Sequence, residues 1–160
     1  MAKSTEIGNR LNVTDKFFVL PNSPLKPISG RVAEPQSLTL AKLDHGFYCD
    51  DETLPVVVAP LRNIGKEWRF VIANQLLVAG SAYAPKTRKP ASGELDSDAA
   101  AFASMVASQI PSPAAVHVLD VCECSGELRL LELNPFGGAD LYACDAIAII
   151  DGDSAIAAAS

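Results

Sequence analysis

The sequence lacks any cluster of basic residues and any long apolar segment. It has 13 Lys and Arg against 19 Asp and Glu, which gives a formal net charge of -6. A nucleic-acid backbone binds a clustered excess of cations, so we expect no nucleic-acid partner. No segment approaches the roughly 18 continuous apolar residues of a membrane span, and the N-terminal MAKSTEIGNRLNV has no apolar signal region. We therefore expect no membrane partner and a cytoplasmic localisation.

Metal-binding and nucleophilic motifs are also missing. The four cysteines and two histidines are Cys49, Cys122, Cys124, Cys144, His45 and His117. Cys122 and Cys124 form C-x-C rather than the C-x-x-C of zinc frameworks, and two histidines cannot supply a His-rich metal site. No G-x-S-x-G elbow indicates a Ser-His-Asp arrangement. We interpret the cysteines as buried free thiols.

The residues that are present suffice for a folded core. The 160 residues are 49% hydrophobic and 20% charged, which is ordinary for a globular protein. The length fits one domain or one lobe of a larger enzyme. Only the two ends of the chain are expected to lack structure.

Short apolar runs predict strands in the first part of the chain. Lys16–Leu20 is stopped by a proline, and residues 27–34 contain a glycine turn followed by a short strand. Pro55–Leu61 predicts a core strand in which Pro60, having no N–H to donate, marks the end of the ladder. Ser37–Leu43 fits a helix turn or an edge strand, and its pattern does not decide between them.

A hairpin is predicted next, with strands Glu67–Ala73 and Leu76–Ala84 joined by a tight turn at Asn74 and Gln75. Side chains alternate between the two faces of a strand. The alternation therefore places Trp68, Phe70 and Ile72 on one face, and Glu67, Arg69 and Val71 on the other. The following segment, Pro85–Gly93, has the composition of a loop.

The rest of the chain predicts a helix, a second hairpin and a further helix. Asp96–Gln109 begins with acidic and serine cap residues and continues with apolar residues at helical spacing. From Ala114, two strands flank a three-residue loop, Ser-Gly-Glu; pairing Cys124 with Leu128 would then place Asp120 opposite Glu132. Residues 139–150 are expected to be helical and residues 151–160 frayed.

The second hairpin carries polar residues in apolar strands. Asp120 and Glu132 stand in mid-strand, and Asn134 shares the face of Glu132 because it lies two residues farther along. Two carboxylates and an amide oxygen that meet suit a hard divalent cation, and Mg²⁺ shares such ligands with nucleotide phosphates. Solvent-facing acidic residues on an amphipathic hairpin would give the same pattern, so both interpretations stay open.

Three blocks of the sequence resemble ATP-grasp enzymes, in the order of that family. VLDVCECSGELRLLELNPFGGADLY is similar to the closing hairpin that holds magnesium against nucleotide phosphates. EWRFVIANQLLVAGSAY resembles the preceding hairpin, in which an arginine follows an acidic residue on a strand. FFVLPNSPLKPISGRV resembles the first strand and lysine turn of a phage and bacterial clade named for an arginine and two lysines.

The resemblance implies a role for each of several residues. Lys26 would bind nucleotide phosphate, and Arg69 would stabilise the transferring phosphoryl group. The hinge that binds adenine would consist of Val58, Ala59, Pro60 and Leu61, and the magnesium ligands would be Asp120, Glu132 and Asn134. On residue grounds alone, Lys26 is also explained as an exposed lysine of a proline-rich turn, and Arg69 as the partner of Glu67 or another acid. Gly137 and Gly138 fit either an anion-binding loop before a helix or an ordinary turn.

The resemblance also implies the fold and the function. We expect an α+β fold with antiparallel sheets packed with helices and the nucleotide held between two lobes. A tail of residues 1–16 would precede a core of residues 17–150, with a small lobe of 17–54 and a larger lobe of 55–150, and residues 151–160 would form a second tail. The expected activity is a Mg-ATP-dependent carboxylate-amine ligase acting on small-molecule or peptide substrates, with ATP and Mg²⁺ as cofactors.

One departure from the family opens an alternative function. The clade usually has an arginine immediately before the proline of its first strand, and this chain has Leu20 before Pro21. ATP-grasp enzymes also carry an N-terminal domain ahead of the region that begins here at Phe17, so we expect a missing N-terminal lobe or a homo-oligomer. The alternative is a non-catalytic module that binds a nucleotide or a partner.

Overall fold

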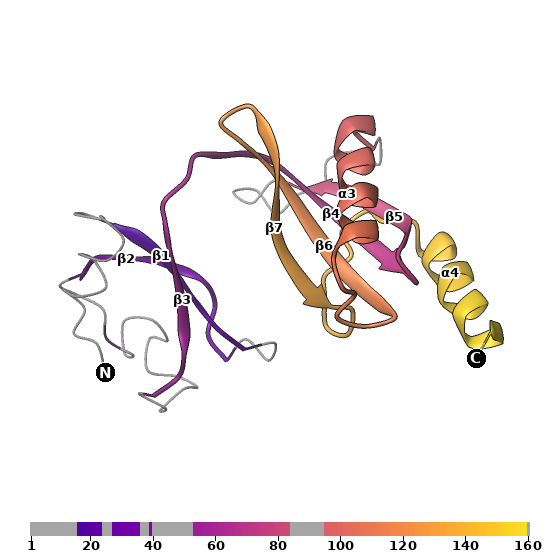
Figure 1. The fold of residues 1–160 in the computed structure, drawn as a ribbon, viewed down its shortest axis with the longest axis horizontal. Helices are drawn as coiled ribbons and strands as arrows, with labels where there is room; N and C mark the ends of the chain where they lie inside the picture. The colour runs from indigo at the N-terminus through magenta and orange to yellow at the C-terminus, as the bar shows by residue number, and fades with distance from the viewer. Residues whose placement is uncertain (1–15, 24–26, 36–38, 40–52, 84–94, 160) are drawn as a thin grey trace. The chain divides into compact units, whose positions relative to one another are not determined.

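A computed structural model describes residues 16–23, 27–35, 39, 53–83 and 95–159 of the chain. It contains two compact units, Met1–Arg62 and Asn63–Ser160. Antiparallel sheets and helices make up the described residues, which confirms the expected α+β class (Figure 1). No helix in these ranges is long and apolar enough to cross a membrane.

The first unit contains a three-stranded antiparallel sheet in the order β2-β1-β3. Its strands are β1 (Phe17–Pro21), β2 (Arg31–Ala33) and β3 (Val56–Pro60). The central strand is β1, where Phe17 and Val19 are fully buried against Ile28. Strand β3 is an edge strand without a fully buried residue, so the expected core strand at Pro55–Leu61 is wrong in its position within the sheet.

The boundary between the two units also differs from the expected one. Because β3 pairs along its whole length with β1, residues 56–60 belong to the first unit, which ends at Arg62 rather than at residue 54. Pro60 pairs with Phe17 at the last position of the ladder, as its missing N–H predicted. The segment Ser37–Leu43, which the sequence left undecided, lies outside the described residues apart from Thr39.

The second unit is a four-stranded antiparallel sheet in the order β5-β4-β6-β7. Its strands are β4 (Ile64–Ala73), β5 (Leu76–Tyr83), β6 (Val116–Cys124) and β7 (Glu127–Pro135). One face packs against α3 (Ser97–Gln109) through the predicted apolar face of Trp68, Phe70 and Ile72. The other face packs at one end against α4 (Ala146–Ala159), where Ile149 covers Val71 and Ala79. Its other end is polar.

Local sequence signals explain the first hairpin and α3. Asn74 and Gln75 form the two-residue turn with φ of 49° and 66°, the left-handed conformation that a tight hairpin turn requires. The Asp96 side chain accepts hydrogen bonds from the backbone N–H of Asp98 and Ala99, at 3.1 and 3.2 Å, and so caps the helix. Both elements were predicted.

The C-terminal helix begins later and ends later than expected. Residues 139–145 are turns, and α4 starts where Asp145 accepts hydrogen bonds from the backbone N–H of Ile147 and Ala148. The helix continues to Ala159, so the expected frayed tail of residues 151–160 is wrong over its helical part. Close packing of Gly152 against Val78, where a Cβ would lie 2.8 Å from a methyl carbon, holds this part on the sheet.

Candidate functional site

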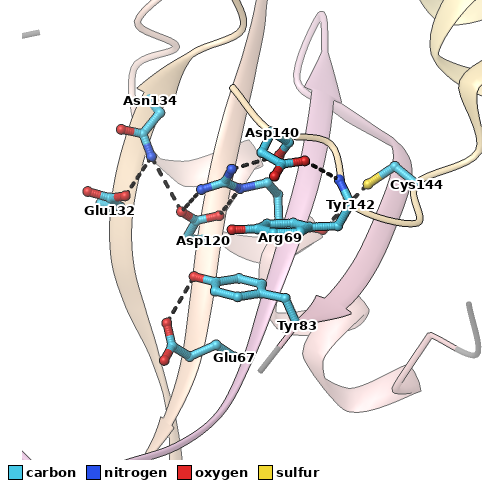
Figure 2. Close-up of polar contacts among 9 residues, drawn as sticks. All are labelled: Glu67, Arg69, Tyr83, Asp120, Glu132, Asn134, Asp140, Tyr142 and Cys144. Atoms are coloured by element: carbon cyan, nitrogen blue, oxygen red, sulfur yellow. Dashed lines mark hydrogen bonds and ion pairs between the residues drawn. The ribbon is translucent and has the colours of Figure 1, made fainter. Parts of the chain in front are cut away.

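A row of polar side chains crosses the second sheet on the face opposite α3. The register places Ser81 of β5 beside Arg69 of β4, Arg69 beside Asp120 of β6, and Asp120 beside Glu132 of β7. Neighbouring side chains on one face of a sheet lie within contact distance of each other. Four strands therefore contribute one polar group each to a single line, which Figure 2 shows around Asp120.

A β-bulge in β7 brings Glu132 into this row. The hairpin turn has two residues, Ser125 and Gly126, so that Cys124 pairs with Glu127 and not with Leu128 as expected. Without a further change, that register would place Leu131 opposite Asp120 and turn Glu132 to the other face. The register instead shifts by one residue between Asp120 and Val121, and the predicted pair of Asp120 and Glu132 forms.

Asp120 and Arg69 form a two-pronged ion pair. Arg69 Nε donates to Asp120 Oδ1 and Nη2 donates to Oδ2, both at 2.8 Å, while the Asp120 residue is fully buried. Burial is the largest influence on the Asp120 carboxyl and raises its pKa, whereas the ion pair with Arg69 opposes that shift. A third N–H of Arg69, on Nη1, donates to the backbone oxygen of Asp140 at 2.7 Å.

Asn134 joins the two carboxylates. Its Nδ2 donates to Glu132 Oε1 at 2.8 Å and to Asp120 Oδ2 at 3.3 Å. Its Oδ1 is buried and has no hydrogen-bond partner among the described residues, although buried acceptors are normally satisfied. The structure thus brings Asp120, Glu132 and Asn134 together on one face, as the sequence predicted.

These three residues fit a hard cation by the chemistry of their oxygen atoms. Two carboxylates and one unsatisfied amide oxygen are ligand types that Mg²⁺ accepts, with water and phosphate completing its shell. No group of three or more His, Cys, Asp or Glu that could hold a metal occurs in the described part of the chain. Any cation at this site would therefore depend on the amide and on a ligand oxygen besides the two carboxylates.

Two tyrosines lie on the other side of Arg69. The Tyr83 and Tyr142 rings are stacked, with centroids 4.7 Å apart and planes 9° from parallel, and the Arg69 guanidinium carbon lies 5.7 Å and 5.1 Å from their centroids. The Tyr83 hydroxyl donates to Glu67 Oε2 at 2.9 Å. Figure 2 shows Arg69 flanked by the carboxylate of Asp120 and by these rings.

The site and the fold agree with the match to a protein family. Residues 4–151 match the model of an ATP-grasp domain family, the third family of the clade named for an arginine and two lysines. The chain belongs to this family. No curated protein matches the chain significantly.

Solved ATP-grasp structures share the fold at low sequence identity. The ligase PsnB, solved with a phosphomimetic variant of its minimal precursor, Mg and ADP, has 15% identity and a TM-score of 0.61, and the match covers 98% of this chain and 51% of that one. PsnB with its precursor peptide PsnA2 and AMPPNP gives 14%, 0.58, 98% and 50%. The D-alanine–D-alanine ligase from Bacillus anthracis, solved with ATP, gives 14%, 0.51, 89% and 45%. This ATP-grasp chain thus spans about half the length of these ligases.

The remaining predicted site residues fall in the first unit. Val58, Ala59 and Pro60 lie on the edge strand β3, and Leu61 follows it with 44% of its surface exposed. Lys26 lies outside the described residues. The binding roles of all these residues stay predictions, as do those of the residues in the second unit.

The structure adds residues that sequence reasoning missed. Tyr83 was given no role, and neither Tyr142 nor the backbone oxygen of Asp140 was considered, yet all three contact Arg69. The expected partner of Arg69 on the alternative interpretation was Glu67 on a half-exposed face; its partner is Asp120, and both residues are buried. Gly137 and Gly138 form a turn, since α4 begins only at Ala146.

Glu67 gives a testable dependence of stability on pH. Burial is the main cause that raises the pKa of Glu67, and the nearby Asp120 and Glu132 add to it, against the hydrogen bond from Tyr83. A raised folded pKa means that the unfolded state loses this proton first, so the folded state loses stability as the pH rises from the ordinary value of about 4.5 through the folded pKa. Replacing Glu67 with Gln removes this loss and keeps an acceptor for Tyr83.

We therefore expect the stability of Glu67→Gln, relative to the unchanged protein, to improve as the pH rises from about 4 to about 7. Urea unfolding at three pH values measures this difference. Glu127→Gln is the control, because that carboxylate is exposed at the start of β7. A difference that stays constant, or that moves the other way, would contradict the assignment.

Proposed function

We propose that this ATP-grasp chain is the catalytic part of a Mg-ATP-dependent carboxylate-amine ligase. The observation that carries the proposal is the row formed by Arg69, Asp120 and Glu132, with Asn134 joining the two carboxylates. Membership of the ATP-grasp family supports it, as do the ligases that share the fold. A buried cation, two clustered carboxylates and an unsatisfied amide oxygen on one face favour a ligand that combines phosphate with a metal ion.

Asp120, Glu132 and Asn134 would hold the magnesium ion. Glu132 is half-buried, and Asn134 presents a buried oxygen without a partner, so a cation would satisfy that oxygen and reduce the repulsion between the carboxylates. When bound, magnesium would neutralise phosphate oxygens as negative charge develops on them. The backbone of β6 and β7 keeps these ligands in place through the bulged register.

Arg69 would bind the transferring phosphoryl group. Asp120 and Asp140 take three of the five N–H groups of its guanidinium, and the other two remain available for oxygen atoms of a ligand. Burial strengthens the interaction of a fixed cation with developing negative charge, because little water is present to screen it. Asp120 would hold this cation and one side of the metal at the same time.

The edge strand β3 would bind adenine, and Lys26 would contact a phosphate. One side of β3 pairs with β1, and its sheet has no strand on the other side among the described residues, so backbone N–H and C=O groups there are available to a ligand. Val58, Ala59, Pro60 and Leu61 would make these contacts. Pro60 offers only its carbonyl oxygen.

The proposed reaction has two steps. An oxygen of the substrate carboxylate attacks the γ-phosphorus of ATP, the bond to the β-phosphate oxygen breaks, and ADP leaves. The amine substrate then attacks the carbonyl carbon of the acyl phosphate, gives up a proton, and releases phosphate as the amide bond forms. The substrates would be small-molecule or peptide carboxylates and amines.

Binding and turnover assays test this function. Calorimetry with a non-hydrolysable ATP analogue and magnesium, followed by ADP release against a panel of amino acids and peptides, should show magnesium-dependent binding and substrate-dependent ADP. Binding without ADP release would favour the alternative, a non-catalytic nucleotide-binding module, which Leu20 before Pro21 motivates. Absence of binding would contradict both functions.

A further inference from the structure

Arg69 is held on several sides by groups outside the proposed metal ligands. Asp120 holds one edge of the guanidinium, and the Asp140 carbonyl holds Nη1 at its tip. The stacked rings of Tyr83 and Tyr142 lie beside the same group at 5.7 and 5.1 Å. An arginine side chain otherwise samples many rotamers, and these contacts together restrict it to one.

The rings are uncharged and favourably placed for this contact. Burial is the main cause that raises the pKa of both tyrosine hydroxyls, so both stay protonated near neutral pH. A cation near the face of an aromatic ring is attracted by the ring's quadrupole, more strongly where water is excluded. The Tyr83 ring is fixed in turn by its hydroxyl, which donates to Glu67.

The loop that carries Tyr142 is tied to the sheet at three points. The backbone N–H of Ala143 donates to Ser81 Oγ at 3.2 Å, and the Cys144 thiol lies 4.0 Å from the backbone oxygen of Arg69. Burial raises the pKa of Cys144 to about 11, which keeps this thiol as a donor. The third point is the Asp140 carbonyl on Arg69 itself. The loop between β7 and α4 is thereby anchored on both β4 and β5.

Tyr142 has a backbone conformation that disfavours its residue type. Its φ of 51° lies in the left-handed region, where glycine and asparagine are more at ease than an aromatic residue. The Asp140 side chain stabilises this conformation by accepting from the Tyr142 backbone N–H at 3.0 Å. Residues held in such a conformation cluster at functional sites. A ring at this position therefore points to a use for the ring itself.

We infer that Tyr142, stacked on Tyr83, is a positioning residue that fixes the Arg69 guanidinium before a phosphate ligand arrives. The value of a fixed cation rests on the proposed function, because preorganised charge stabilises a transferring phosphoryl group without further rearrangement. The restraint on Arg69 is a property of the chain alone. It can therefore be tested without any nucleotide.

Hydrogen exchange at the Arg69 side chain tests the inference. We would label the full chain with ¹⁵N-arginine and measure the exchange of the Nε–H group with water. Tyr142→Asn and Tyr142→Gly remove the ring and suit the left-handed backbone, so at least one of them is expected to fold. Tyr142→Phe keeps the ring, and Arg129, which pairs with Glu127 on the exposed part of β7, is the internal control.

Loss of the ring should speed exchange at Arg69 Nε–H by about 2- to 30-fold, the factor that corresponds to a cation–π contact. Tyr142→Phe should stay within about twofold of the unchanged protein, because the ring and its quadrupole remain. Exchange at Arg129 should be the same in all variants. Unchanged exchange at Arg69 in any folded ring-free variant would overturn the inference. The proposed function is judged separately, by magnesium-dependent nucleotide binding, so the two can fail independently.

Discussion

Replacing Glu132 with Gln is expected to weaken magnesium-dependent binding of a non-hydrolysable ATP analogue by about 10- to 100-fold, which is the typical loss for even an indirect partner of a bound metal. Gln keeps the size of the side chain and one oxygen but removes the charge that the cation needs. The acceptor for Asn134 Nδ2 also remains, so the fold should be little affected. Calorimetry with magnesium and with a chelator measures the effect.

The control for this variant is Glu127→Gln, which removes a carboxylate from the exposed end of the same strand. It should bind the analogue as tightly as the unchanged protein. In the chelator, Glu132→Gln and the unchanged protein should bind equally weakly, because the difference between them is the metal. Equal binding in magnesium, together with unchanged ADP production, would show that Glu132 is not a metal ligand.

Replacing Arg69 with Met is expected to destabilise the fold by about 3–5 kcal/mol, the typical cost of removing one partner of a buried ion pair. The loss arises because Asp120 is fully buried and would keep only Asn134 and Glu132 as polar neighbours. The carboxyl must then either carry an unpaired charge or take up a proton. Urea unfolding at neutral pH measures the change in the free energy of unfolding.

A double variant separates the buried charge from the lost packing of Arg69. Arg69→Met combined with Asp120→Leu removes both charges, and replacing a buried ion pair by apolar residues is often neutral or stabilising. The double variant should therefore be more stable than Arg69→Met alone, although it cannot bind metal at Asp120. If the two single effects simply add, the buried pair is not coupled as its geometry of 2.8 Å contacts indicates.

Alternation along the strands was sufficient to predict which side chains share a face. Trp68 and Phe70 were assigned to the core and Arg69 to the opposite face, and both assignments are confirmed. The two-residue period depends only on the backbone of a strand, so it can be read without knowledge of the fold. The same period correctly placed Glu132 and Asn134 together.

The register across the strands could not be derived in the same way. Both hairpins of the second unit contain a shift of one residue, between Val71 and Ile72 in β4–β5 pairing and between Asp120 and Val121 in β6–β7 pairing. In the second hairpin, an expected loop one residue too long compensated for the bulge that was not foreseen. The predicted neighbour of Asp120 was therefore correct although the predicted turn was wrong. Bulges arise from packing and twist and leave no reliable signal in the sequence.

The aromatic side of the site was invisible for a related reason. Tyr83 lies opposite Glu67 only because of the shift in the first hairpin; an unshifted ladder would place Ala82 there. Tyr142 lies in a loop without periodicity, in a backbone conformation that its residue type does not favour. Alternation of the strand itself does put Tyr83 on the face of Ser81, which was the one available signal.

The central claim is that Asp120, Glu132 and Asn134 hold a metal ion together with a nucleotide. The most direct test is a crystal structure of the chain with a non-hydrolysable ATP analogue and Mn²⁺, whose anomalous scattering locates the ion. We predict one peak within about 2.0–2.4 Å of oxygens from Asp120 and Glu132, the distance range of hard cations, and in contact with a phosphate oxygen. A nucleotide bound with its metal away from these two carboxylates would contradict the claim.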